Sequence, residues 1–197
     1  HAMDRGIPIT SDTLDECAHA HSILKRKRGW ATKCHMIHGN HERFYKDFTA
    51  KFPQLNSLLN FKFLSDMENL GYTTTDIKDV YKVGSLSVIH GDLRFYGQSG
   101  TTLEKSAKTF GGDVIIGHVH CPTSRFGCHA MGLSGKLDQG YNEVNASGWA
   151  HGFAIVNQYK GFNFIHNLVV DAKKITLNFN GEISEATKSD LINELKG

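Results

Sequence analysis

Three short runs of apolar and β-branched residues stand out in the first 120 residues, because each leads into a motif of glycine and histidine. The runs occupy residues 34–38, 86–89 and 113–116, and their length and composition predict strands. The motifs that follow are Gly39-Asn40-His41-Glu42, His90-Gly91-Asp92 and Gly117-His118-Val119-His120. A strand that ends in a glycine turn holds the next side chains at a sheet rim, where ligands collect in α/β folds.

Apolar residues at helical spacing lie between these strands. We expect helices over residues 11–28, 42–51 and 55–70, and another from Thr101 or Thr102 to the Gly111-Gly112 pair. Strands separated by helices give the first half of the chain the pattern of a parallel sheet.

The second half alternates between apolar and polar residues. Residues 80–83 and 86–90 flank Gly84-Ser85 as a hairpin, and the glycine-rich residues 121–148 predict hairpins and loops. Further strands are expected over residues 152–156, 162–166 and 175–179, with a final helix over about 184–195. We therefore predict one domain, a four-layer α/β/β/α sandwich of two mixed sheets flanked by helices, with a site at the strand-end rim.

Composition narrows the class of protein. The chain has 197 residues, of which 40% are hydrophobic, and its 22 Lys and Arg nearly balance 20 Asp and Glu, so no broad nucleic-acid surface is expected. No apolar run is long enough for a membrane span. The four cysteines form no CxxC pair and suit free thiols in the cytoplasm. The 12 histidines raise the expectation of a metal site.

The three motifs bring imidazoles and one amide to strand ends. These ligands suit Mn²⁺, Fe or Zn²⁺, and two ions about 3.5–4 Å apart can clamp a phosphate and generate a hydroxide nucleophile. The alternative is that each histidine caps a strand or satisfies a hydrogen bond in the core. Further rim candidates are Cys121, Cys128, His129 and His151, although a packed thiol is the simpler interpretation of Cys121.

The order of the motifs resembles that of the calcineurin-like metallophosphoesterases, in which D-x-H and G-D-x-x-D precede G-N-H-[DE], H-G and G-H-x-H. The resemblance implies that Asn40, His90 and His118 bind one divalent metal ion and His120 a second. Mn²⁺ is favoured, with Fe, Zn or Ni as alternatives. It also implies that His41 is the catalytic histidine, which assists departure of the leaving oxygen.

The start of the chain looks like the end of the second block in the serine/threonine phosphatase branch. Asp4 would then orient His41, and Arg5 would clamp the phosphate, although a surface charge beside a turn is the alternative for Arg5. The D-x-H block is absent, and His1 stands where the metal-bridging aspartate is expected. We expect the chain to be an N-terminally incomplete copy that lacks its first strand.

The resemblance implies hydrolysis of a phosphomonoester or phosphodiester by a metal-bound hydroxide. The sequence Trp149-x-x-Gly152-Phe153, followed by an apolar strand, resembles phage and bacterial members of the family. The substrate can be a phosphorylated small molecule, a nucleotide or a phosphoprotein, and the Asp-Arg-Gly sequence favours monoesters. Two alternatives remain: an inactive scaffold of the same fold that binds a protein partner, and a mononuclear metal-binding protein that uses Asn40, His90 and His118. The oligomeric state is left open.

Overall fold

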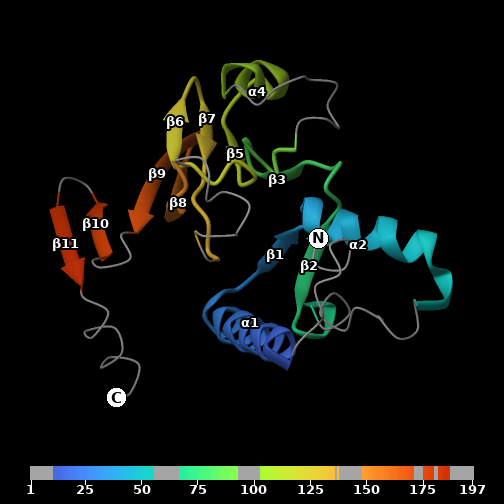
Figure 1. The fold of residues 1–197 in the computed structure, drawn as a ribbon. Coiled ribbons are helices and arrows are strands. Elements are labelled where there is room, and N and C mark those ends of the chain that lie inside the picture. Colours follow the sequence, from blue (N-terminus) through green and yellow to red (C-terminus); the bar gives the residue numbers. More distant parts are fainter. Residues whose placement is uncertain are drawn as a thin grey trace. The chain divides into compact units, whose positions relative to one another are not determined.

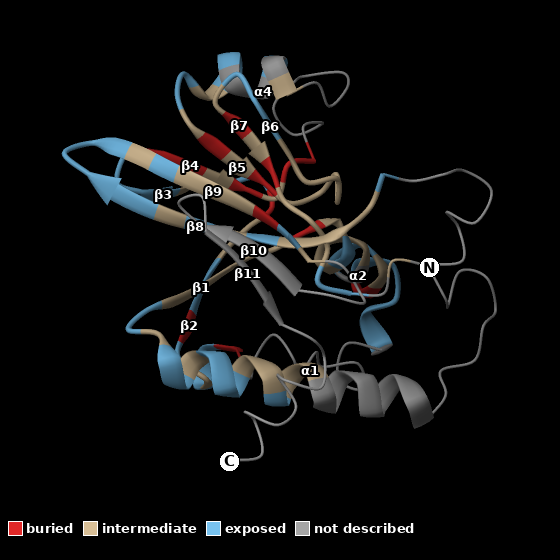
Figure 2. Ribbon diagram, turned by 90° about the vertical axis from the view of Figure 1, so that its left-hand side faces the viewer, coloured by how far each residue is buried: buried red, intermediate tan, exposed pale blue. Residues whose placement is uncertain are grey.

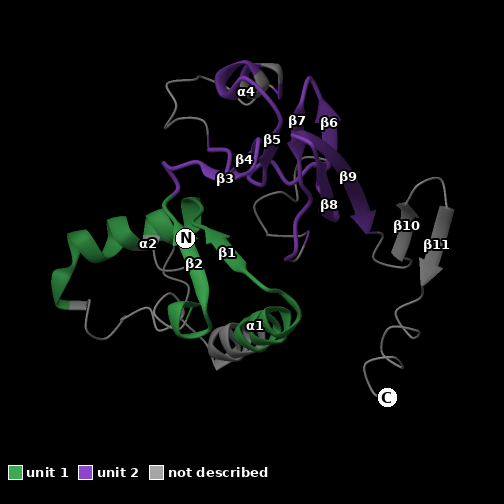
Figure 3. Cartoon of the chain, turned by 180° about the vertical axis from the view of Figure 1, so that it is seen from behind, with its two compact units in different colours: residues 1–76 green, residues 77–197 purple. Residues whose placement is uncertain are grey.

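The computed structural model describes residues 11–55, 67–92, 103–135, 137, 148–170, 175–179 and 182–186. It is a mixed α/β structure with a five-stranded mixed sheet and smaller two-stranded sheets (Figure 1). The chain divides into two compact units, residues 1–76 and 77–197 (Figure 3). The single domain expected from the sequence stays a prediction.

The first unit is built on a pair of parallel strands, β1 (Cys34–Ile37) and β2 (Tyr72–Thr75). Helix α1 (Ser11–Trp30) precedes β1, and helix α2 (Asn40–Lys51) and the short 3-10 turn η2 (Pro53–Leu55) follow it. The hydroxyl of Tyr72, which is 8% exposed, donates a hydrogen bond to the carbonyl of Leu24 at 2.9 Å. This bond anchors α1 on β2.

The second unit contains the five-stranded sheet, whose order is β3-β4-β5-β7-β6. Its parallel centre consists of β4, β5 and β7, and the outer strands β3 and β6 run antiparallel to their neighbours. The bounds are β3 (Tyr81–Val83), β4 (Leu86–Ile89), β5 (Val114–Ile116), β6 (Thr123–Arg125) and β7 (Cys128–Ala130). The predicted hairpin across Gly84-Ser85 is confirmed as β3–β4.

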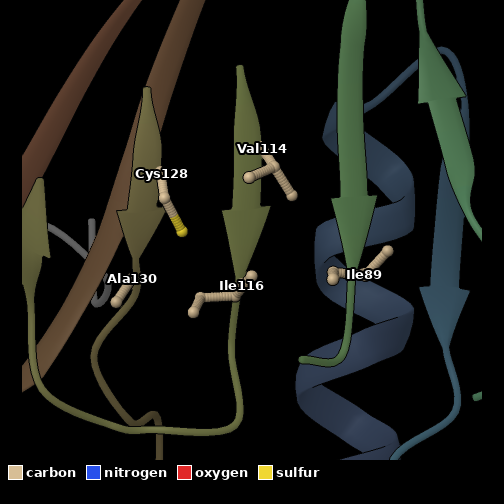
Figure 4. Packing of buried hydrophobic residues seen from close by; sticks show 5 residues of the cluster. All are labelled: Ile89, Val114, Ile116, Cys128 and Ala130. Atoms are coloured by element: carbon tan, nitrogen blue, oxygen red, sulfur yellow. The ribbon is translucent and has the colours of Figure 1, made fainter. Parts of the chain in front are cut away.

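The main buried cluster of the second unit lies on one face of this sheet (Figure 4). It consists of side chains that are at most 2% exposed: Ile89, Val114, Ile116, Cys128 and Ala130. Leu103 and Phe110 of helix α4 (Leu103–Phe110) pack against this cluster. Figure 2 shows the central strands as largely buried, and for β4 and β5 this agrees with the near-continuous apolar runs that predicted them.

The long hairpin β8 (His151–Tyr159) and β9 (Phe162–Val170) is joined to the five-stranded sheet by side-chain hydrogen bonds. The Asn163 amide donates to Asp113 Oδ2 at 2.9 Å, and the Asn167 amide donates to the carbonyl of Ala130 at 2.8 Å. The Gln158 amide donates to the carbonyl of Val83 at 2.7 Å. The two asparagine bonds are partly buried, so they replace water for polar groups that the packing would otherwise leave unpaired.

The C-terminal part departs from expectation. Strands β10 (Ile175–Phe179) and β11 (Glu182–Ala186) form an antiparallel pair in which Phe179 lies opposite Glu182. The helix predicted from residue 184 is therefore wrong over residues 184–186, and its remainder lies outside the described residues. The sequence signal was Asn180-Gly181, a dipeptide typical of a two-residue hairpin loop.

The other predicted elements match the structure closely. Helix α1 extends two residues beyond its predicted end, α2 begins two residues before its predicted start, and β8 and β9 are longer than predicted. Of the helix expected over 55–70, the structure describes helical residues only at 67–69. None of the described helices is long and apolar enough to cross a bilayer. Cys34, Cys121 and Cys128, whose side chains the structure describes, are free thiols.

Candidate functional site

The ends of β4 and β5 bring two of the predicted metal ligands together. The strands are parallel neighbours with Ile89 opposite Ile116, so His90 and Gly117 leave the sheet side by side. The carbonyl of His90 accepts hydrogen bonds from the backbone N–H of Gly117 at 3.0 Å and of His118 at 2.7 Å. The backbone itself thus holds the His90 and His118 positions together.

Glycine is needed at position 91 to make this junction. Its φ of +97° lies in the region that L side chains avoid. A Cβ added to Gly91 would also lie 2.9 Å from the Cβ of Ile116, closer than two carbon atoms can pack. The glycine of the His-Gly motif therefore lets the end of β4 pass close to β5.

The His90 and His118 rings form a pair. His118 Nδ1 lies 3.0 Å from His90 Nε2, with the ring centroids 4.9 Å apart in an edge-to-face arrangement. Both side chains are half-buried. One ring carries the shared proton when no metal is bound, because one nitrogen must donate and the other accept. Since metal–imidazole bonds are about 2.0–2.1 Å long, two nitrogens at this separation can bind the same ion.

His120, the last histidine of the third motif, packs against Trp149. The two ring centroids are 4.7 Å apart in an edge-to-face arrangement, and the N–H of Ala150 donates to the His120 carbonyl at 3.2 Å. His120 adopts a φ of +57°, which is uncommon for a residue with a Cβ. Trp149 is therefore a site neighbour that the motifs alone did not identify, although the Trp-x-x-Gly-Phe sequence pointed to its segment.

A close backbone approach holds the Trp149 segment in place. A Cβ on Gly132, just after β7, would overlap the backbone of Ala150 and Gly152. The N–H of Leu133 also donates to the carbonyl of Ala150 at 2.8 Å. Residues 148–150 therefore run directly beside the end of β7, and glycine is required where they meet.

In the first unit, the first motif forms the start of α2. Gly39 is the N-cap, and the Glu42 carboxylate accepts a hydrogen bond from the Gly39 N–H at 2.6 Å. This is the backward half of a capping box. Asn40 and His41 thus lie in the first helical turn rather than in a loop. His41 is exposed, with the Phe44 ring at a centroid distance of 6.3 Å.

His35 on β1 and His38 just after it differ in their hydrogen bonds. His35 Nδ1 lies 2.6 Å from Thr73 Oγ1 and its Nε2 lies 2.7 Å from Thr75 Oγ1, so β2 engages both nitrogens. Burial, followed by the nearby His38, lowers the pKa of His35. Both ring nitrogens of His38 are buried without a hydrogen-bond partner among the described residues. An unsatisfied buried donor costs about 1–3 kcal/mol.

The predicted site residues are thus partly placed. His90 and His118 lie together in the second unit, whereas Asn40 and His41 belong to the first, and a shared site for the two groups stays a prediction. The proposed His41 partner Asp4, the proposed phosphate ligand Arg5 and residue His1 lie outside the described residues.

The other rim candidates have structural partners. Cys128 is fully buried in the core, and its neighbour His129 lies with Nδ1 3.0 Å from Ser124 Oγ. His151 Nε2 lies 2.8 Å from the carbonyl of Gly135. Asp92, the last residue of the second motif, is only 4% exposed and is a buried carboxyl at the site edge that was not among the predicted ligands.

The residues present fit a metal ion in part. The His90–His118 pair offers two imidazole nitrogens, which suit divalent transition metals. Within the described ranges, however, no three His, Cys, Asp or Glu side chains gather as a metal-binding group.

Comparison with known proteins identifies no relative: no protein-family model, curated protein or solved structure matches this chain.

Proposed function

We propose that this protein is a metal-dependent phosphoesterase of the calcineurin-like kind. The observation that carries the proposal is the His90–His118 pair, with its ring nitrogens 3.0 Å apart at the ends of adjacent parallel strands. Two separate motifs of the expected order converge at this point. Two features argue against a chance pair of histidines. The backbone N–H groups of Gly117 and His118 donate to the His90 carbonyl, and the close packing of the two strand ends requires glycine at position 91.

We extend the proposal to the α/β/β/α sandwich. In support, α4 packs on one face of the five-stranded sheet through Leu103 and Phe110. The β8–β9 hairpin is hydrogen-bonded to the same sheet through Asn163 and Asn167. In the proposed sandwich, α4, the five-stranded sheet and the β8–β9 hairpin would be three successive layers of the four.

In the proposed site, His90 and His118 would hold one divalent ion, together with Asn40 as the family resemblance implies, and His120 would hold the second, with Mn²⁺ as the favoured metal. When bound, such ions act as Lewis acids toward phosphoryl oxygens and lower the pKa of water. Imidazole and amide ligands leave the ions with most of their charge, which favours binding of an anionic substrate.

His41 is the proposed proton donor to the leaving oxygen. Its exposed position in the first turn of α2 suits this role, because the ring can reach a substrate without displacing core residues. The Glu42–Gly39 hydrogen bond fixes the turn that presents it. Asp4 would orient His41, and Arg5 would bind the phosphate. The proposed substrate is a phosphomonoester of a small molecule, a nucleotide or a phosphoprotein in the cytoplasm.

The test is hydrolysis of a chromogenic phosphomonoester and phosphodiester with added Mn²⁺. A general acid contributes about 10²–10⁴-fold, so His41→Ala should lower kcat by about that factor while Mn²⁺ binding, measured by calorimetry, is retained. His118→Ala should lose both activity and Mn²⁺ binding. His166→Ala on β9 is the matched control and should leave both unchanged. Wild-type activity in His41→Ala would refute the mechanism.

A second candidate is a mononuclear metal-binding protein without hydrolytic activity. It is favoured by the finding that the described residues gather only two histidines, with no third His, Cys, Asp or Glu ligand among them. The same experiment separates the two functions. Mn²⁺ binding that depends on His118, without hydrolysis of either substrate, would support this second candidate.

A further inference from the structure

The β8–β9 hairpin carries an exposed aromatic surface. Residues opposite each other in an antiparallel pair point to the same face, so the register assigns Phe153 to the face of Leu168 and Tyr159 to that of Phe162. On this side five large apolar residues are exposed by 38–71%. They are Phe153 (45%), Ile155 (38%), Tyr159 (62%), Phe162 (71%) and Phe164 (53%), and we call them the aromatic face.

The opposite face of the hairpin already has its partner. It carries Asn163 and Asn167, whose amides donate to Asp113 and to the carbonyl of Ala130 in the five-stranded sheet. Val156 and Ile165 lie opposite each other on this inner face and are half-buried. The aromatic face is therefore the outer side over the distal part of the hairpin. At the hairpin base this pattern reverses, since Leu168 on this side is 4% exposed and Val169 on the inner side is 48% exposed. Figure 2 shows exposed residues toward the hairpin end.

The size and charge of the aromatic face are unusual for a surface in water. An aromatic side chain presents about 150–250 Å², so the exposed fractions amount to roughly 500 Å². This is near the upper limit for patches on monomeric proteins, and such patches mark interaction sites. The remaining residues that share this side are His151, Asn157, His166, Leu168 and Val170, so it carries no Asp, Glu, Lys or Arg.

We propose that the aromatic face is the surface through which two copies of this chain associate. An uncharged face offers no complementarity to an acidic or basic partner, whereas it can pack against an identical face about a two-fold axis. Sheets pack face to face about 10 Å apart. Two copies would bury roughly 1,000 Å², the lower limit of a specific interface. The dimer is accordingly weak and depends on concentration.

The inference does not involve the histidine pair, since none of its residues lies there. It requires that the outer helical layer of the proposed sandwich leaves the aromatic face open. Sedimentation equilibrium of the full chain should show a monomer–dimer equilibrium with a Kd of about 1–100 µM, as expected for a small interface. The double variant Phe162→Lys and Phe164→Lys should raise this Kd at least about tenfold. The residues that contribute most to an interface are apolar and fully desolvated, and a lysine there would have to bury its charge. Phe126→Lys is the matched control: Phe126 is 67% exposed on the β6–β7 turn and should leave Kd unchanged.

Near-UV circular dichroism of each variant should match that of the wild type, because both sites are exposed. A wild-type chain that stays monomeric throughout this concentration range would overturn the proposal, as would a dimer that the double variant leaves intact. A third variant ending at residue 186 tests a different occupant. If only that shortened chain dimerises, the C-terminal segment of the same chain covers the aromatic face, and the proposal is wrong.

Discussion

The first unit and the second each contain a strand that runs into a histidine motif, yet the support beneath the two motifs differs. β4 and β5 end above a core in which Ile89 and Ile116 are 2% and 1% exposed. Among the described strands, β1 pairs only with β2, and all four of its residues are half-buried. The histidines after β4 and β5 form a pair, whereas His41 after β1 is exposed.

This difference shows that a motif alone does not determine how firmly its side chains are held. In the second unit, a buried sheet, a shared carbonyl and a required glycine restrict His90 and His118 together. In the first unit, the 39–42 motif is held mainly by its helix cap, in which Glu42 accepts from Gly39. Metal ligands need the first kind of support, whereas a proton donor that meets substrate can function with the second.

The largest expected effect tests this contrast in packing. Ile116→Ala should lower the free energy of unfolding by about 2–5 kcal/mol, because it leaves a cavity in a close-packed core. The matched change Ile37→Ala in the half-buried β1 should cost only about 1 kcal/mol. Native-state hydrogen exchange of the β5 and β1 amides would measure each unit separately. Equal costs in the two strands would contradict the comparison.

A smaller effect is expected at the junction between β4 and β5. Gly91→Ala combines a left-handed backbone cost of about 1–2 kcal/mol with overlap against Ile116. Gly111→Ala is the control, because its φ of +63° is also positive but no atom of the described residues lies within 4 Å of the added Cβ. Denaturant melts should show the greater loss for Gly91→Ala. Nitrogen NMR of the rings should show that only this variant separates His90 from His118.

The smallest effect is a pH dependence that should appear in both units. Burial lowers the pKa of His35 and of His129 from the ordinary 6.5, and for His129 the nearby Asp113 partly offsets it. As the pH falls, these two imidazoles therefore take up protons at a higher pH in the unfolded chain than in the folded protein. Stability is therefore complete above about pH 6.5 and declines below it, toward the lowered pKa values.

Urea midpoints measured above and below that pH would quantify this decline. His129→Gln should flatten the pH profile of the second unit, and His35→Gln that of the first. An unchanged slope in both variants would show that other groups are responsible.

Most elements were predictable because their signals are local. The buried strands β4 and β5 followed from apolar runs, and α1 and α2 from helical spacing and caps. The strand β11 was missed because residues 182–186 carry little pattern of their own, and the Asn180-Gly181 dipeptide was the better guide. Sequence also assigned His90 and His118 to one site. It did not identify Trp149 beside His120, because the Trp-x-x-Gly-Phe sequence does not indicate which residue the indole ring contacts.

The sequence by itself determined which residues end strands and which chemistry they carry, because periodicity, glycine turns and imidazole side chains are properties of short segments. Only the tertiary structure decided which of them meet. Pairing β4 with β5 brought together two rings 28 residues apart, and packing against Ile116 made Gly91 necessary. The aromatic face likewise emerged from the register of β8 and β9, since alternation shows that a strand has two sides but not which side the sheet covers.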